Sequence, residues 1–116
     1  MTLKELMEKT GLRLLTPKAS LSREVTTGYS CDLLSWVLAH GQAGMAWITV
    51  QTHMNVIAVA MLMDMSCVII PEGIELEKAT LEKAIEEEVP VFSSDKTAYE
   101  LCGLMYALGV GQAERT

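Results

Sequence analysis

The pattern of apolar and polar positions predicts a strand, a helix and a second strand in the middle of the chain. Met45–Val50 is a short apolar segment rich in strand-forming residues, Gln51–His53 is polar, and Met54–Met65 is an apolar segment of helix length. Cys67–Ile70 is again apolar and β-branched, and a proline follows it. Two strands joined through a helix in this way are expected to be parallel, with a right-handed crossover.

The segments before this unit predict two helices and two strands. Thr2–Glu5 has the form of a capping box, in which a threonine and a glutamate cap the start of a helix, and Gly11 suits the end of that helix. Ser30 is the expected cap of the second helix. The expected strands are Leu12–Thr16 and Glu24–Tyr29, and the expected second helix is Asp32–Ala39.

The segments after the central unit predict a helix, a strand and a last helix. Glu77–Glu88 is expected to be helical, and Val89–Phe92 is expected to be a strand near an edge of the sheet because Pro90 cannot donate a ladder hydrogen bond. Ser93–Asp95 offers several N-cap candidates for the last helix. The side chains expected to face the sheet are Leu81, Ala84 and Ile85 of the first helix, and Ala98, Leu101, Cys102, Met105 and Leu108 of the last.

Together these elements predict a single compact α/β domain over residues 1–110, in which helices flank a small, mainly parallel sheet. A chain of 116 residues is long enough for one packed core and too short for two. The segment 111–116 is expected to be a disordered tail.

The helix expected from Met54 onward is apolar on all sides, so all of its surface should be covered. The sheet covers one side. The rest is expected to meet a second copy of the chain, since two-fold dimers are the commonest assembly. The alternative is a wholly internal helix in a three-layer monomer.

Composition narrows the classes of partner. Half of the residues are apolar and the net charge is −6, without a basic stripe, so we expect neither a disordered chain nor a nucleic-acid-binding protein. The apolar segment from Met54 is interrupted at Asp64 and is too short to span a bilayer, so we expect no membrane partner. Three cysteines are an odd number, and the N-terminal segment mixes acidic residues into an amphipathic pattern unlike a signal peptide. These features predict reduced thiols and a cytoplasmic location.

Polar residues gather where the first central strand passes into its helix, which is where open α/β sheets bind ligands. Gln51, Thr52, His53 and Asn55 lie in this junction and could hold an anionic or nucleotide-like ligand, helped by the backbone N–H groups at the helix start. The other interpretation is that Thr52 or His53 caps the helix and Asn55 completes a turn. Asp32 either reaches the same edge of the sheet or, as we prefer, lies in the first turn of its own helix.

Two segments resemble the DRTGG domain family, which is related to the N-terminal domain of HPr kinase/phosphorylase. They are Val25–Ser35, which is similar to the signature region, and Trp47–Ala60, which is similar to a second block; with the spacing to Val68–Ile70 they extend the likeness over nearly the whole chain. The name-giving motif itself is altered, since Thr27 stands where a second glycine is expected. The resemblance implies a compact α/β domain that dimerises and serves regulation, and it implies a ligand role for the loop around Gly28.

No motif predicts a reaction. No lysine follows a glycine, so there is no phosphate-binding P-loop, and the histidines and cysteines lack metal-ligand spacing. We therefore expect no cofactor, no metal and no kinase or ATPase activity. The preferred function is a non-catalytic regulatory or ligand-binding module, which as a homodimer binds a nucleotide or phosphorylated small molecule. The alternative is a small enzyme that uses His53 with Asp32 or Cys31.

Overall fold

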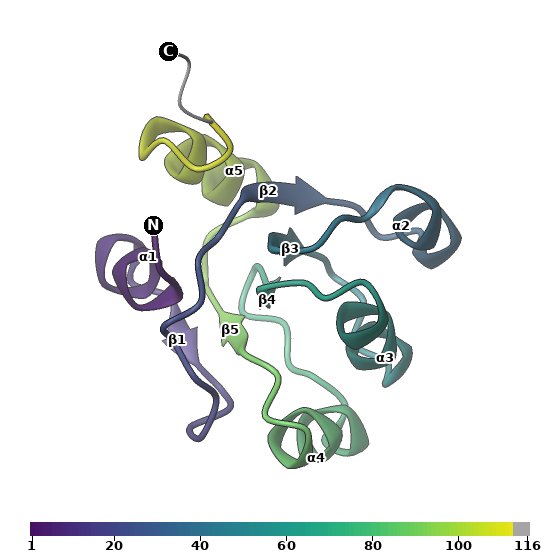
Figure 1. Ribbon diagram of the computed structural model, residues 1–116. Helices are drawn as coiled ribbons and strands as arrows, with labels where there is room; N and C mark the ends of the chain where they lie inside the picture. Colours follow the sequence, from purple (N-terminus) through teal and green to yellow (C-terminus); the bar gives the residue numbers. More distant parts are fainter. Residues whose placement is uncertain (113–116) are drawn as a thin grey trace.

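Five strands form one mixed sheet in the order β1-β5-β4-β3-β2, in a computed structural model that describes residues 1–112 (Figure 1). The four strands from β5 to β2 run parallel, and β1 pairs antiparallel with β5. The strands are β1 (Arg13–Leu14), β2 (Thr27–Ser30), β3 (Met45–Ile48), β4 (Cys67–Ile70) and β5 (Val91–Ser93).

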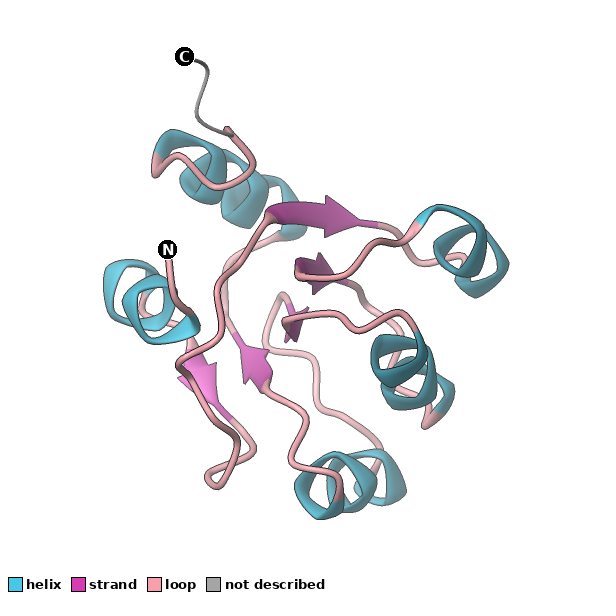
Figure 2. Ribbon diagram, viewed as in Figure 1, coloured by secondary structure: helices cyan, strands magenta, loops and turns pink. Residues whose placement is uncertain are grey.

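Helices cover both faces of this sheet (Figure 2). On one face α2 (Leu34–His40), α3 (Asn55–Leu62) and α4 (Lys78–Glu86) enclose a core centred on Trp47, and on the other α1 (Leu3–Thr10) and α5 (Ala98–Ala107) enclose a core centred on Phe92. The expected α/β class, with a small, mainly parallel sheet flanked by helices, is confirmed.

The central unit is also confirmed. β3 and β4 pair in parallel, with Trp47 opposite Val68, and all four residues of each strand are buried because their two faces pack against the two helical layers. β4 has the expected bounds, but β3 and α3 are shorter than expected: β3 ends at Ile48 and α3 begins only at Asn55. The six residues between them form the connection in which the polar junction lies.

One of the three expected helix starts is confirmed. Thr2 and Glu5 form the capping box of α1. Ser30 is not a cap, because it is the last residue of β2 and α2 begins after Leu33. The cap of α5 is Thr97 rather than a residue of Ser93–Asp95, whose members end β5 and bond to neighbouring loops.

β5 is near an edge of the sheet, as expected, because only β1 lies outside it. Pro90 precedes β5, and its carbonyl accepts the Val68 N–H. Two side-chain placements were wrong. Ile85 is exposed, and Thr80 is buried in α4 instead, with its hydroxyl bonded to a loop carbonyl. Cys102 is exposed, although its neighbours Leu101 and Met105 are buried as expected.

The monomer leaves part of α3 uncovered. Val56, Ile57, Val59 and Ala60 are buried, whereas Leu62 is 74% exposed and Met61 44% exposed. The alternative of a wholly internal helix is therefore wrong. An uncovered apolar face is what the dimer hypothesis requires, but the hypothesis itself stays a prediction.

The expected tail falls partly within the described chain. The Gly111 Cα lies so close to Thr27 that an added Cβ would overlap the Thr27 hydroxyl, and Gln112 bonds back to Tyr106. Residues 113–116 lie outside the described part, and the expectation of disorder there stays untested. Across residues 1–112, every helix is too short or too polar to cross a membrane.

Candidate functional site

The predicted junction leaves the sheet at the carboxyl end of β3. Thr49 is buried at this point and its N–H donates to the Ile69 carbonyl at 3.1 Å, so the backbone keeps its strand pairing for one more residue. The chain then turns away over Val50–Met54 before α3 begins. The side chains of this turn therefore lie at the carboxyl edge of the sheet, where the sequence placed them.

Asp32 reaches the same edge from β2. One carboxylate oxygen accepts from the Thr49 hydroxyl at 2.8 Å and from the Val50 N–H at 2.9 Å, and the Asp32 carbonyl accepts from the Gln51 side chain at 2.9 Å. The preferred interpretation, an Asp32 in the first turn of its helix, was wrong, because α2 begins at Leu34. Asp32 instead joins the ends of two adjacent parallel strands.

Thr52 connects this turn to the next connection along the sheet. Its hydroxyl lies 3.4 Å from a Glu77 carboxylate oxygen, and its carbonyl accepts from the Thr80 hydroxyl at 2.7 Å. Most polar groups of Gln51 and Thr52 are thus bonded within the protein.

His53 and Asn55 are exposed. The His53 Nδ1 accepts from the Asn55 N–H at 3.2 Å, so His53, rather than Thr52, satisfies a backbone donor at the start of α3. Within residues 1–112, the backbone N–H groups of Thr52, His53 and Met54 have no hydrogen-bond acceptor. Free N–H groups favour the binding of an anion here. The negatively charged carboxylates of the adjoining loops disfavour it.

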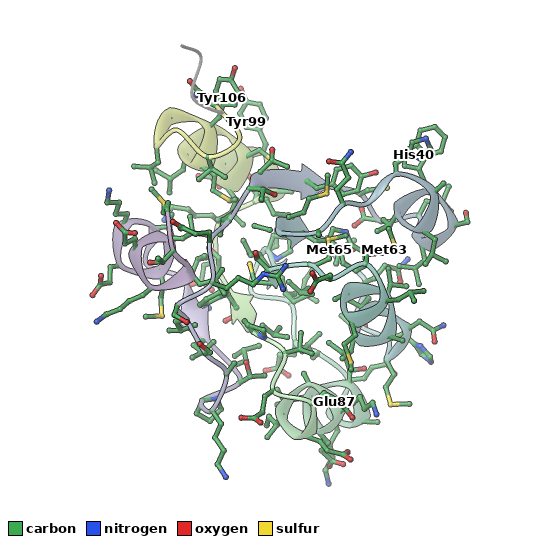
Figure 3. The ribbon with its side chains drawn as sticks, viewed as in Figure 1. His40, Met63, Met65, Glu87, Tyr99 and Tyr106 are labelled. Carbon is green, nitrogen blue, oxygen red and sulfur yellow. The ribbon has the colours of Figure 1, made fainter. Side chains whose placement is uncertain are left out.

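Gly28 does not join this group. It lies within β2 with its Cα turned toward α5, where an added Cβ would lie 3.3 Å from the Met105 methyl group. A small hollow of about 160 Å³ lies here, between β2 and α5, and Tyr106 is one of its lining residues. Figure 3 shows the Tyr106 side chain on α5. The expected ligand role of Gly28 therefore concerns a different place from the junction.

A second hollow, of about 390 Å³, lies by the loops that follow β4 and β5. It contains none of the predicted site residues. The sequence signals it only weakly, through the turn residues that follow each strand. Its lining consists of Arg13, Leu15, Gly73, Ile74, Glu75, Leu76, Leu81, Ser93 and Asp95.

The catalytic alternative needs a nucleophile or acid in contact with His53. In the described chain no hydrogen bond joins His53 to Asp32 or Cys31, and the Cys31 thiol lies 3.8 Å from the Leu33 carbonyl. Burial raises the pKa of the neighbouring Tyr29 hydroxyl, which has no hydrogen-bond partner. Residues 1–112 hold no cluster of three potential metal ligands.

Comparison with known proteins finds a solved structure with a similar fold. No protein-family model and no curated protein matches the sequence. The structure is similar to the crystal structure of the CBS and DRTGG domains of the regulatory region of Clostridium perfringens pyrophosphatase, complexed with its activator, diadenosine tetraphosphate. The TM-score is 0.67 at 11% sequence identity, over 90% of this chain and 45% of that one.

The chain therefore spans less than half the length of that regulatory region. At 11% identity the likeness shows the fold. The expected likeness to DRTGG domains is confirmed at that level.

Proposed function

We propose that this chain is a regulatory module that binds a small anionic, nucleotide-like ligand at the carboxyl edge of its sheet and acts as a homodimer in the cytoplasm. One observation carries the proposal: the fold is similar to part of a regulatory region that is complexed with a nucleotide activator. A fold alone does not fix a function, so the site must supply the rest of the argument.

The carboxyl edge of the sheet supports binding better than catalysis. Four parallel strands end there, and open α/β sheets bind ligands at this edge. The alternative, a small enzyme, requires His53 to contact Asp32 or Cys31. In the described chain the Asp32 carboxylate bonds to Thr49 and Val50, the Cys31 thiol lies near the Leu33 carbonyl, and neither is hydrogen-bonded to His53 for proton transfer.

A thermal-shift screen tests the ligand. Purified protein is melted with adenosine mono-, di- and triphosphate and with diadenosine tetraphosphate, and with adenosine as the uncharged control. A ligand at about a hundred times its Kd should add roughly 2.7 kcal/mol of stability. No shift with any of these nucleotides would refute the nucleotide-like ligand, and ATP hydrolysis that is lost in His53→Ala would favour the enzyme instead.

The dimer is supported by apolar side chains on the outer surfaces of α2 and α3. Trp36 is 52% exposed and Leu62 74%, and Leu38 and Met61 are also exposed. The two helices lie side by side on the same face of the sheet (Figure 1). Burial of such side chains against a second copy would contribute about 25 cal/mol for each Å² removed from water.

Sedimentation velocity tests the dimer. Leu62→Glu should give a folded monomer, because its side chain is mostly exposed and its loss costs the monomer little. Tyr99→Glu is the matched control, since Tyr99 is 89% exposed on the opposite face and should leave the dimer intact. A wild-type monomer at micromolar concentration, or a dimer that only Tyr99→Glu disrupts, would contradict the proposed interface.

The three cysteines support the cytoplasmic location. None of them forms a disulfide, and Cys102 is an exposed free thiol, which is typical of proteins from reducing compartments.

A further inference from the structure

The connections of the sheet reverse direction between β4 and β5. β4 is followed by α4, which packs on the same face as α2 and α3, whereas β5 is followed by α5 on the opposite face (Figure 2). Two adjacent strands whose connections leave to opposite faces open a crevice at their carboxyl ends. No such reversal occurs at β3, because the connections after β2, β3 and β4 all leave to one face.

The hollow of about 390 Å³ lies at this reversal. It is lined by residues 73–76 of the loop after β4, by Leu81 of α4, by Arg13 and Leu15, and by Ser93 and Asp95 at the end of β5. Beside it, the loops after β4 and β5 are held together by backbone hydrogen bonds: the Glu72 N–H donates to the Lys96 carbonyl and the Gly73 N–H to the Ser94 carbonyl, both at 2.8 Å. Glu72 and Gly73 both have positive φ, which costs a glutamate free energy. The hollow is therefore a preformed feature of the backbone, and its volume is within the range of about 300–1,000 Å³ that is typical of small-molecule sites.

The side chains of the hollow divide into an apolar wall and a polar end. Leu15, Ile74, Leu76 and Leu81 supply a surface for a flat apolar group. At the polar end, Arg13 of β1 is held opposite Ser93 by the strand register.

Arg13 is bonded to Asp95 across this end. Its two terminal nitrogens lie 3.0 and 3.4 Å from the Asp95 carboxylate oxygens, and both side chains are more than half exposed. The Arg13 guanidinium lowers the pKa of Asp95, so the carboxylate is charged at neutral pH. An exposed ion pair of this kind contributes little to stability, and a ligand phosphate can replace the Asp95 carboxylate on the same guanidinium.

We infer that this hollow, which lies between β1, the end of β5 and the loop after β4, is a nucleoside phosphate site, in which Arg13 exchanges Asp95 for the ligand phosphate. The inference rests on the proposed function and places its ligand away from the β3–α3 junction. The apolar wall contacts the base, and Glu75, a carboxylate that also lines the hollow, accepts hydrogen bonds from the ribose hydroxyls. Binding releases the Asp95 loop from β1, so the conformation of the loop that leads into α5 depends on the ligand.

Calorimetric titration with adenosine monophosphate tests the inference through the two halves of the ion pair. Arg13→Gln should weaken binding about tenfold or more, because it removes a charge-assisted contact to the phosphate. Asp95→Asn should tighten binding about threefold or more, because Arg13 no longer has a competing partner. Binding of adenosine, which has no phosphate, should change in neither variant.

The matched controls come from a second arginine–aspartate pair. The Arg23 guanidinium lies 2.7 Å from an Asp64 carboxylate oxygen, outside the hollow, so Arg23→Gln and Asp64→Asn should leave the titration unchanged. Opposite shifts in Arg13→Gln and Asp95→Asn, against these controls, would establish the exchange. A purely structural ion pair would give equal losses of melting temperature and no difference in affinity.

Three results would overturn the inference. Equal affinity for adenosine monophosphate in wild type, Arg13→Gln and Asp95→Asn would show that the phosphate does not bind in the hollow. Binding that survives Arg13→Gln and is lost in His53→Ala or Asn55→Ala would place the ligand at the β3–α3 junction and leave the proposed function standing. If neither adenosine monophosphate nor diadenosine tetraphosphate binds the wild-type protein, the proposed function itself fails.

Discussion

Replacing Asp32 by alanine should destabilise the protein, because one carboxylate oxygen holds the ends of β2 and β3 together. That oxygen accepts hydrogen bonds from the Thr49 hydroxyl and the Val50 N–H at 2.8 and 2.9 Å. Thr49 is buried, so its hydroxyl cannot turn freely to water once the carboxylate is gone. Asp32→Ala therefore removes the hydrogen-bond acceptor of the buried Thr49 hydroxyl and of the Val50 backbone N–H.

The magnitude follows from the number and exposure of these bonds. A hydrogen bond to a charged group contributes about 1.5–3 kcal/mol, but Asp32 is exposed and water will replace the carboxylate at the Val50 N–H. We expect a loss of about 2 kcal/mol in the free energy of unfolding for Asp32→Ala. For a chain of this size that corresponds to roughly 8 °C in melting temperature. Asp32→Asn, which keeps an acceptor oxygen, should lose less than half as much.

Urea unfolding followed by tryptophan fluorescence measures this change, since Trp47 is buried and becomes exposed on unfolding. The double variant with Thr49→Val isolates the bond between the two side chains and should show a coupling energy of about 0.5 kcal/mol or more. A loss below about 0.5 kcal/mol in Asp32→Ala would refute the structural role. Asp32 would then be free to contact a ligand, as one interpretation of the sequence allowed.

Three further outcomes are expected. A thiol reagent should label Cys102 rapidly and Cys67 only after unfolding, because burial raises the pKa of the Cys67 thiol and shields it; equal labelling rates in the folded state would contradict this. Arg13 lowers the pKa of Asp95. The stability from this pair is therefore present above the pKa of the unfolded aspartate, about 3.9, and is lost as the pH falls through the lower pKa of the folded state. In Asp95→Asn, the melting temperature should change less with pH over that acidic range. Phe92→Ala should lose about 3–5 kcal/mol in urea unfolding, because the ring is fully buried at the centre of the α1–α5 core.

The parallel core of the fold could be predicted because its signals are repeated along the chain. The apolar segments of β3 and β4 are buried on both faces, and such strands have no polar alternation to obscure them. The start of α1 could be predicted for a different reason: the Thr2 and Glu5 capping box is a local interaction that needs no other element.

The errors occurred where a local signal had to compete with a contact from a distant segment. Ser30 is a good cap by type, but pairing with β3 extends β2 through it and delays the helix. Ile85 is apolar, but Thr80 is buried in α4 because the Thr52 carbonyl accepts its hydrogen bond. The 3.6-residue period of an apolar pattern does not show which of these partners is present.

The candidate site shows the same limit. Composition and position placed Gln51 and Thr52 at the carboxyl edge of the sheet, where the structure has them, whereas Asp32 reaches that edge against the preferred interpretation. What the sequence could not show is that they bond mainly to one another and to neighbouring loops, so that most of their polar groups already have partners. A group of polar residues at a strand end therefore predicts its position at the sheet edge better than it predicts which of its polar groups remain free.

The strand order explains why the sequence signals the second hollow only weakly. Arg13 and Asp95 are 82 positions apart, and neither belongs to a motif. They meet because β1, a strand of two residues, adds antiparallel to β5, and because β5 sends its connection to the face opposite that of β4. In a sheet whose successive connections otherwise leave to one face, that single reversal sends the chain after β5 to the α5 face, while the chain after β4 turns to α4. The position of a crevice thus follows from the path of the chain between strands, and the residues that line it acquire their roles only once that path is known.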